Sequence, residues 1–307
     1  MNKKFITIFT PTYNRAYLLR NLYNSLLEQT DKDFNWIVVD DGSTDNTEEL
    51  FNEFKSENKM DITYVKKQNA GKPSAINDGL DLSEDELFFI VDSDDYLTPN
   101  AIERIRYYYD QVKDKPNFIG VVGQRGDKDH KPYINYYGQE SKKKNKYYDL
   151  EYVDADALEY RYKYKIGGDR AEVFTTRLLK NYRFPIIDNE KFIFETIVWN
   201  KIANDGYKQR WFNEVIYITE YQEDGLSKNI EKHLKNNPKS TLHWFNSSLK
   251  WKHMPFDERL SQCTKYYQYG MQAGKTIDEL YKECNDKFLS LFAIPRAKKN
   301  NALKYYK

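Results

Sequence analysis

Short apolar runs alternate with amphipathic segments along the first third of the chain. The runs have the length and the β-branched or aromatic content of buried strands, and they lie at residues 5–10, 36–39, 62–65 and 87–91. Leucines at helical spacing follow the first run: Leu18, Leu19, Leu22, Leu26 and Leu27. Further helices are expected to begin near Thr47, Ser74 and Pro99. This βαβ rhythm predicts a mostly parallel sheet with helices on both faces, because such crossovers return right-handed to the same sheet.

The pattern changes after Val122, where a stretch rich in Gly, Lys and Tyr predicts a surface loop that includes the charge run 142–144. Strand and helix patterns then resume in three segments: 171–174, 195–204 and 211–219. Beyond Leu226 the pattern is helical only. The chain is therefore expected to divide into three parts: residues 1–125, 126–225 and 226–307.

The charges nearly balance, with 48 basic and 47 acidic residues, so no overall field favours nucleic acid. The two cysteines, Cys263 and Cys284, have no metal-ligand spacing, which argues against a disulfide framework or a zinc site and fits a reducing cytoplasm. The sequence shows no signal-peptide core and no stretch of about 18 apolar residues. We therefore expect a cytoplasmic protein without a membrane span and without a nucleic-acid partner.

Polar segments follow the four predicted strands. They are Thr10-Pro11-Thr12-Tyr13-Asn14-Arg15, Asp40-Asp41-Gly42-Ser43, Asn69-Ala70-Gly71-Lys72 and Asp92-Ser93-Asp94-Asp95. Ligands of open α/β sheets bind at the carboxyl ends of the strands, so these segments are where function should be sought.

The segment after the fourth run places two carboxylates, Asp92 and Asp94, two residues apart. Such hard oxygen ligands can hold Mg²⁺ or Mn²⁺ between themselves and a diphosphate. The alternative is that Asp95 or Thr98 caps the helix beginning at Pro99. A calcium loop is excluded, because the glycine and the glutamate that such a loop needs are missing.

Two other segments offer contacts to a nucleotide. Asp41 can accept a hydrogen bond from the imide N–H of uracil or thymine, and Tyr13 offers a ring for stacking the base. Lys72 lies in a glycine-containing loop, where it can meet phosphate charge. The alternatives are an Asx turn from Asp41 into Gly42 and an exposed lysine without function.

Taken in order, the four segments resemble the nucleotide-binding half of family 2 glycosyltransferases of the GT-A fold. The match includes Val38-Val39 before the second segment and Ala75-Ile76-Asn77 after the third. The resemblance implies an α/β fold of GT-A type, a mostly parallel sheet flanked by helices. It makes residues 1–125 the Rossmann-like, nucleotide-sugar-binding half, residues 126–225 the acceptor-binding and catalytic half, and residues 226–307 a C-terminal helical extension.

The resemblance also implies which residues contact the ligands. The nucleotide-sugar contacts would be Pro11, Thr12, Tyr13, Arg15, Asp41, Asn69, Lys72, Asp92 and Ser93, and the metal ligands would be Asp92 and Asp94. The implied cofactor is Mn²⁺ or Mg²⁺.

A weaker match continues through segments 168–174, 184–185 and 194–199, so the resemblance covers about residues 4–227. Family members usually open this last helix with an acidic pair whose second carboxylate is the catalytic base. Here the pair reads Phe194-Glu195, so Glu195 is the implied base, and the alternative is a helix-start glutamate favoured by the helix dipole. Gly168, Asp169 and Trp199 are implied acceptor contacts.

These residues imply an inverting transfer of a single sugar from a nucleotide-diphosphate sugar to a hydroxyl of a saccharide or lipid-linked acceptor. A UDP-sugar is the first choice of donor, with dTDP behind it, and surface polysaccharide, capsule or O-antigen assembly is the family-level expectation. Gln209-Arg210-Trp211 lacks the spacing of the processive synthases, which favours single addition. The alternative is a non-catalytic sugar-binding module. An oxidoreductase or a nucleotidylyltransferase is disfavoured, because Pro11 stands where a glycine-rich turn is needed.

The C-terminal tail combines an apolar segment, residues 288–295, with the basic residues Arg296, Lys298, Lys299, Lys304 and Lys307. Such a segment can rest on the anionic inner face of the plasma membrane, as a peripheral contact. The alternative is a terminal helix that docks on the core.

Overall fold

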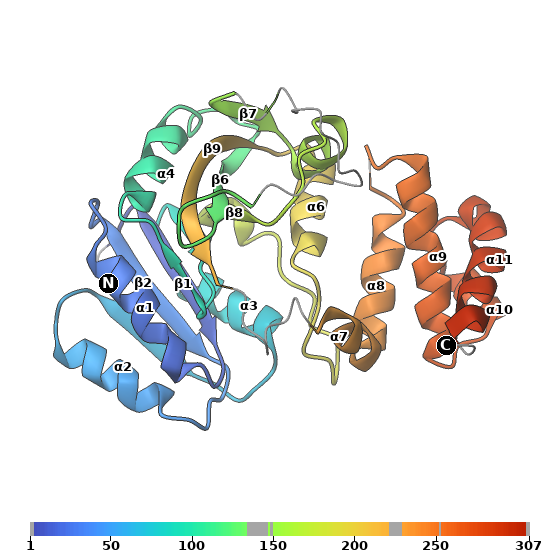
Figure 1. Ribbon diagram of the computed structural model, residues 1–307, viewed down its shortest axis with the longest axis horizontal. Coiled ribbons are helices and arrows are strands. Elements are labelled where there is room, and N and C mark those ends of the chain that lie inside the picture. The colour runs from blue at the N-terminus through green and yellow to red at the C-terminus, as the bar shows by residue number, and fades with distance from the viewer. Residues whose placement is uncertain (1–2, 134–146, 148–149, 221–228, 252, 305–307) are drawn as a thin grey trace.

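A mixed sheet forms the centre of the molecule, and a group of helices stands beside it at the C-terminal end (Figure 1). The computed structural model describes residues 3–133, 147, 150–220, 229–251 and 253–304. Its strands are β1 (Ile6–Thr12), β2 (Phe34–Asp40), β3 (Ile62–Lys66), β4 (Leu87–Ile90), β5 (Asp95–Leu97), β6 (Phe118–Gly126), β7 (Tyr152–Ala155), β8 (Arg170–Thr175) and β9 (Lys208–Thr219). Within these residues the sheet order is β3-β2-β1-β4-β8-β6-β9-β5, and β7 pairs with β9.

The helices lie on both faces of the sheet and beyond it. They are α1 (Ala16–Leu27), α2 (Thr47–Ser56), α3 (Lys72–Leu82), α4 (Ala101–Asp110), α5 (Thr176–Leu179), α6 (Thr196–Asn204), α7 (Ile230–Asn236), α8 (Pro238–Ser248), α9 (Phe256–Gln272), α10 (Ile277–Glu283) and α11 (Lys287–Lys304), with a π-helical turn at Glu159–Lys163. No helix in the described part of the chain is both long and apolar enough to cross a bilayer.

The N-terminal half of the sheet is parallel, as the alternating pattern predicted. β1 pairs in parallel with β2 and β4, and β2 pairs in parallel with β3. Every residue of β1 and β2 is buried, because helices cover both faces. One apolar cluster joins this sheet to α1, α2 and α4, and a second joins it to α3, α5 and α6. The predicted α/β fold class is confirmed.

The other half of the sheet contains antiparallel strands. β8 runs antiparallel to β4 and β6, and β5 and β7 run antiparallel to β9. The predicted break after Val122 is too early, because β6 continues to Gly126 through its ladders with β8 and β9. β5, three residues long, was not predicted, since its pairing partner lies more than a hundred residues away in the sequence.

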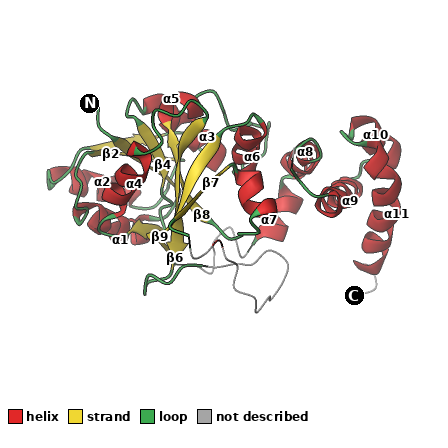
Figure 2. Ribbon diagram, turned by 90° about the horizontal axis from the view of Figure 1, so that it is seen from above, coloured by secondary structure: helices red, strands yellow, loops and turns green. Residues whose placement is uncertain are grey.

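The C-terminal helices have an apolar core of their own. Leu242, Cys263, Tyr267, Leu280 and Leu289 are among its buried members, and both cysteines are free thiols. Figure 2 shows α8, α9 and α11 in a row beyond the sheet. The predicted helical extension is thus observed. The predicted boundary near residue 225 and the charge run 142–144 lie outside the described residues.

Candidate active site

A cleft of about 530 Å³ lies at the carboxyl ends of the parallel strands. It brings together most of the residues expected from the sequence, which are Tyr13, Asp41, Asn69, Lys72, Asp92, Gly168, Asp169, Glu195 and Trp199. The remaining expected residues are not part of the lining. Pro11, Thr12 and Ser93 are buried, and Arg15 and Asp94 are partly exposed.

Asp41 organises the loop that precedes α3. Its Oδ1 accepts a hydrogen bond from the backbone N–H of Ala70 at 2.8 Å, and its Oδ2 accepts one from Gly71 at 2.7 Å. The Asx turn belongs to the neighbouring Asp40, whose Oδ1 accepts from the N–H of Ser43. An ionised carboxylate has about four acceptor positions, so Asp41 retains capacity for a base. Its predicted role in reading the base stays a prediction.

Lys72, at the start of α3, connects the two sides of the cleft. Its Nζ lies 2.6 Å from Asp92 Oδ1 and 2.6 Å from Glu195 Oε1. Burial lowers the pKa of Lys72, but the two carboxylates raise it by more, and the net pKa is above the usual value. The lysine is therefore a cation held between two acids, and the alternative of an exposed lysine without a partner is wrong.

The acidic segment after β4 carries more negative charge than its neighbours neutralise. Burial raises the pKa of Asp92, but Lys72 and Arg125 lower it by more. Burial and the nearby Asp92 raise the pKa of Asp94, which forms no ion pair within the described residues. Burial also raises the pKa of Asp95 to about 7, although Arg125 opposes the shift. Excess charge of this kind is what a divalent cation would relieve.

The residues present fit a metal ion shared with a substrate. No group of three or more His, Cys, Asp or Glu side chains with metal-binding geometry occurs among the residues that the structure describes. Asp92 and Asp94 would therefore supply only part of a coordination shell, and diphosphate oxygens would supply more, as is usual for Mg²⁺. The capping alternative is wrong, because α4 begins after Asn100 without a side-chain cap.

Glu195 occupies the N-cap position of α6. Its side chain makes no capping hydrogen bond and reaches Lys72 in the cleft, so the alternative of a glutamate that only serves the helix start is disfavoured. The preceding Phe194 packs its ring 4.6 Å from that of Trp244 on α8. Trp244 also donates a hydrogen bond to Thr196 Oγ1 at 3.2 Å. The C-terminal helices thus support the start of α6, and Phe194 packs at the position where the resemblance implies a first acid.

Sequence reasoning missed five charged residues that line the cleft: Arg125, Arg161, Arg170, Glu172 and Lys191. Two of them, Arg125 on β6 and Glu172 on β8, lie close to the acids already described. The Arg125 guanidinium lies 4.2 Å from the ring centroid of Tyr217 and 3.7 Å from Asp95. Burial raises the pKa of Glu172 to about 7, an effect that Arg125 opposes and Glu195 reinforces. Arg125 was missed because it lies in the stretch that was predicted to be a surface loop. Glu172 was missed because nothing in the sequence around it indicates that its strand is buried.

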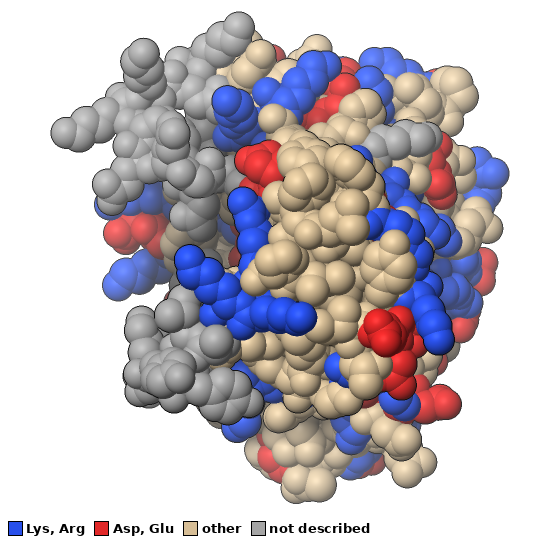
Figure 3. Space-filling model, turned by 90° about the vertical axis from the view of Figure 1, so that its right-hand side faces the viewer, with Lys and Arg blue, Asp and Glu red and all other residues tan. Residues whose placement is uncertain are grey.

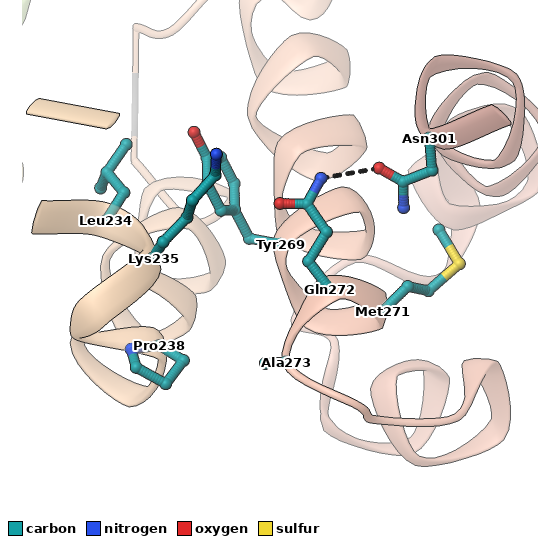
Figure 4. A pocket seen from close by; sticks show the side chains of 8 residues that line it. All are labelled: Leu234, Lys235, Pro238, Tyr269, Met271, Gln272, Ala273 and Asn301. Carbon is teal, nitrogen blue, oxygen red and sulfur yellow. Dashed lines mark hydrogen bonds between the residues drawn. The ribbon is translucent and has the colours of Figure 1, made fainter. Parts of the chain in front are cut away.

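A second cavity, of about 560 Å³, lies among the C-terminal helices (Figure 4). It is lined by residues of α7, α8, α9 and α11 and of the turn that follows α9, and a hydrogen bond of 2.8 Å from Gln272 Nε2 to Asn301 Oδ1 crosses its wall. Lys235 is the one charged residue in its described lining. A single lysine offers no acid–base pair, so the cleft at the sheet is the better candidate for catalysis.

Comparisons with known proteins identify the family of the chain. A model of the family described as Glycosyl transferase family 2 matches residues 7–168. Glycosyltransferase GlyA of Streptococcus pneumoniae is 25% identical over 279 residues, which cover 89% of this chain. Poly(ribitol-phosphate) beta-N-acetylglucosaminyltransferase TarP of Staphylococcus aureus is 28% identical over 204 residues, 66% of this chain. The chain spans only part of the length of these relatives, 36% of GlyA and 55% of TarP.

Solved structures share the fold. Residues 1–349 of S. aureus TarS in complex with UDP-GlcNAc match with a TM-score of 0.59 at 18% identity, over 89% of this chain and 77% of that one. The mannosyltransferase PcManGT from Pyrobaculum calidifontis, in complex with GDP-Man and Mn²⁺, matches with a TM-score of 0.55 at 16% identity, over 98% of this chain and 88% of that one. At these identities the likeness shows the architecture.

Proposed function

Because the chain belongs to glycosyltransferase family 2, we propose that it transfers a single sugar, with inversion, from a nucleotide-diphosphate sugar to an acceptor hydroxyl. One observation carries the proposal: Lys72 lies 2.6 Å from Asp92 on the donor side and 2.6 Å from Glu195 at the start of α6. Diphosphate binding and acceptor activation can therefore occur in one cleft. We propose that residues 1–125 bind the nucleotide-sugar donor and that residues 126–225 bind the acceptor and catalyse the transfer. Residues 226–307 would support the start of α6.

On the donor side, Asp41 accepts the imide N–H of uracil and Tyr13, with an exposed ring, stacks on the base. A UDP-sugar is the favoured donor, and TarS, which shares the fold, is known in complex with UDP-GlcNAc. Lys72 meets the diphosphate charge. Asp92 and Asp94 would hold Mn²⁺ or Mg²⁺, which when bound supplies positive charge to the departing diphosphate.

On the acceptor side, Glu195 removes the proton of the attacking hydroxyl. The attack comes from the face opposite the diphosphate and inverts the anomeric carbon. Lys72 positions the Glu195 carboxylate before the donor arrives, and phosphate oxygens then compete for the same ammonium group. Gly168, Asp169 and Trp199 line the side of the cleft where the acceptor would lie.

The function is tested by a screen of nucleotide sugars. We expect the chain to release UDP slowly from one UDP-sugar without acceptor, and faster when a saccharide acceptor is added. The anomeric configuration of the product, read by NMR, should be opposite to that of the donor. Donor binding without either hydrolysis or transfer would contradict the proposal and support a non-catalytic module.

Asp41 is tested by measuring UDP affinity. Asp41→Ala removes a charge-assisted hydrogen bond, and we expect UDP binding to weaken by about 1.5–3 kcal/mol, which is about 10-fold to 150-fold. The same change frees the N–H groups of Ala70 and Gly71. Calorimetry with CDP, whose base lacks the imide, is therefore the matched control. Equal losses for UDP and CDP would limit Asp41 to shaping the loop.

We also propose a saccharide or lipid-linked acceptor and a peripheral site of action at an anionic membrane. Helix α11 has two apolar faces: Leu289, Ala293 and Ala297 are fully buried, while three large side chains opposite them are exposed. These are Phe288 at 62%, Leu291 at 62% and Phe292 at 48% exposure. The docked-helix alternative is thus correct for one face only.

The charges beside this exposed face favour an anionic surface. Helix α11 contains no Asp or Glu, and Lys287, Arg296, Lys298 and Lys299 are exposed on it. Figure 3 shows an uncharged band with Lys and Arg on both sides of it and with some Asp and Glu at its edges. The nearby acid Glu283 on α10 is paired with Lys275 at 2.6 Å. Apolar side chains beside basic ones are typical of interfacial helices.

The membrane contact is tested by vesicle sedimentation. Replacing Phe288, Leu291 and Phe292 by Ser should lower binding to phosphatidylglycerol vesicles at least about tenfold, because each buried apolar side chain contributes about 1 kcal/mol or more. Ile186→Ser, at a residue 56% exposed outside α11, is the matched control and should bind normally. If the unaltered chain does not bind the vesicles, the proposal is contradicted. If the unaltered chain is a dimer and the triple variant is not, the exposed face of α11 binds a second copy of the chain instead of a membrane.

A further inference from the structure

Arg170, the first residue of β8, is a buried cation without a counter-ion. Its exposure is 3%, and it forms no ion pair within the described part of the chain. Its Nη2 donates a hydrogen bond to the carbonyl of Gly167 at 2.9 Å, while Nε and Nη1 have no hydrogen-bond partner there. Burying a charge and two donors without compensation is costly, so something outside the described chain is expected to meet them.

The side chain lies between the main cleft and a small cavity of about 30 Å³ that adjoins it. Arg161, Glu172, Thr196 and Trp199 line both spaces as well. Thr196 directly follows Glu195, so the guanidinium whose Nε and Nη1 lack a partner shares a wall with the proposed base. A group bound there would belong to the acceptor, because the donor contacts lie on the opposite side, at the ends of β1, β2 and β4.

The position of Arg170 is fixed from several sides. Its guanidinium lies 5.6 Å from the ring centroid of Tyr160, and that ring stacks on Trp211 with centroids 3.9 Å apart. Its carbonyl accepts a hydrogen bond from Arg125 Nε at 2.8 Å, and its backbone pairs with Gln124 of β6. A rigid cation of this kind loses little entropy when it binds a ligand.

We propose that Arg170 is a subsite for an anionic group of the acceptor, a phosphate or a carboxylate, next to the hydroxyl that Glu195 deprotonates. The proposal rests on the proposed function and specifies its acceptor. A water molecule or a sugar hydroxyl would satisfy the free donors but would leave the charge uncompensated, whereas an anion meets both needs through charge-assisted hydrogen bonds. Asp169 and Glu172 line the same wall, but neither forms an ion pair with Arg170 within the described residues, and the cation that acts on Glu172 is Arg125.

The test compares acceptors that differ only in one substituent: a neutral glycoside, its phosphate monoester and the corresponding uronic acid. The unaltered chain should use one anionic acceptor at least about tenfold better, by kcat/KM, than the neutral one. In Arg170→Gln this preference should disappear, and Arg170→Lys should restore part of it. Arg177→Gln, an exposed arginine of α5 that lies outside the cleft, is the matched control and should keep the preference.

Two results would overturn the proposal. Equal use of neutral and anionic acceptors by the unaltered chain, or an equal loss for both in Arg170→Gln, would assign the free donors to a buried water. Thermal melting of each variant separates loss of fold from loss of preference. Binding of inorganic phosphate, measured by calorimetry and expected to be weaker in Arg170→Gln, gives a readout independent of turnover. Release of UDP from the donor without acceptor tests the proposed function alone. If no UDP is released from any nucleotide sugar, the proposed function is refuted, and not only the subsite at Arg170.

Discussion

Replacing Glu195 by Gln is expected to lower the rate of transfer at least about 100-fold, the usual scale of general-base catalysis. Glutamine keeps the shape and polarity of the side chain but cannot accept the proton of the acceptor hydroxyl. Donor affinity should change little, because Lys72 keeps its second carboxylate partner, Asp92, at 2.6 Å. The measurement is the transfer rate at saturating donor and acceptor, together with UDP affinity by calorimetry.

Two other acids of the chain serve as comparisons for this change. Glu190 accepts hydrogen bonds from the backbone N–H groups of Lys239 and Ser240 at the start of α8, so Glu190→Gln should leave the rate nearly unchanged. Glu172 lies in the cleft, and Glu172→Gln is the decisive rival. If Glu195→Gln retains near-normal transfer while Glu172→Gln loses it, Glu172 is the base. Loss of UDP binding in Glu195→Gln would instead make Glu195 structural.

The parallel half of the fold could be predicted because its information is local. Strands of four to seven residues and the helices between them follow one another along the chain, and each carries its own periodic pattern. Helix starts were predicted less accurately: α3 begins at Lys72 and not at Ser74. The loop just before Lys72 is held by hydrogen bonds that the N–H groups of Ala70 and Gly71 donate to Asp41. Nothing in the loop sequence shows that a side chain thirty residues earlier holds it.

The antiparallel half depends on contacts between distant segments. β5 pairs with the end of β9, and β8 inserts between β4 and β6, so neither could be placed from local patterns. Ion pairs between distant segments could not be predicted for the same reason. Sequence identified Lys72, Asp92 and Glu195 separately, by motif, but not the bridge that Lys72 forms between the two acids.

The position of Phe194 shows how packing outside the family match changes a motif. An acid is usual there, and its absence left the identity of the base open to an error of one residue. The ring instead packs against Trp244 of the C-terminal helices, and both residues lie beyond the segment 7–168 that the family model matches. In the structure Phe194 packs on Trp244, while Glu195 contacts Lys72, so the alignment that makes Glu195 the base stays a prediction.

Replacing Asp94 by Asn is expected to have the other large effect, a loss of at least about 100-fold in metal-stimulated turnover. Charge stabilisation of a departing diphosphate by a divalent ion contributes several kcal/mol, and each 1.36 kcal/mol corresponds to a tenfold change in rate. Asp94 is the acid to test, because Asp92 is already paired with Lys72 whereas Asp94 forms no ion pair within the described residues. In the unaltered chain, a chelator should abolish transfer, and Mn²⁺ or Mg²⁺ should restore it.

Asp95→Asn is the matched control for Asp94→Asn, since Asp95 faces Arg125 at 3.7 Å and is not expected to bind the ion. A direct readout is the affinity for Mn²⁺ in the presence of UDP, followed by electron paramagnetic resonance. It should weaken in Asp94→Asn and persist in Asp95→Asn. Full transfer by Asp94→Asn in the presence of a chelator would remove the metal from the mechanism and leave Lys72 as the cation proposed to meet the diphosphate. Lys72→Met should then cause the larger loss, because within the described residues Lys72 is the cation that contacts both the donor-side acid and the proposed base, at 2.6 Å from each.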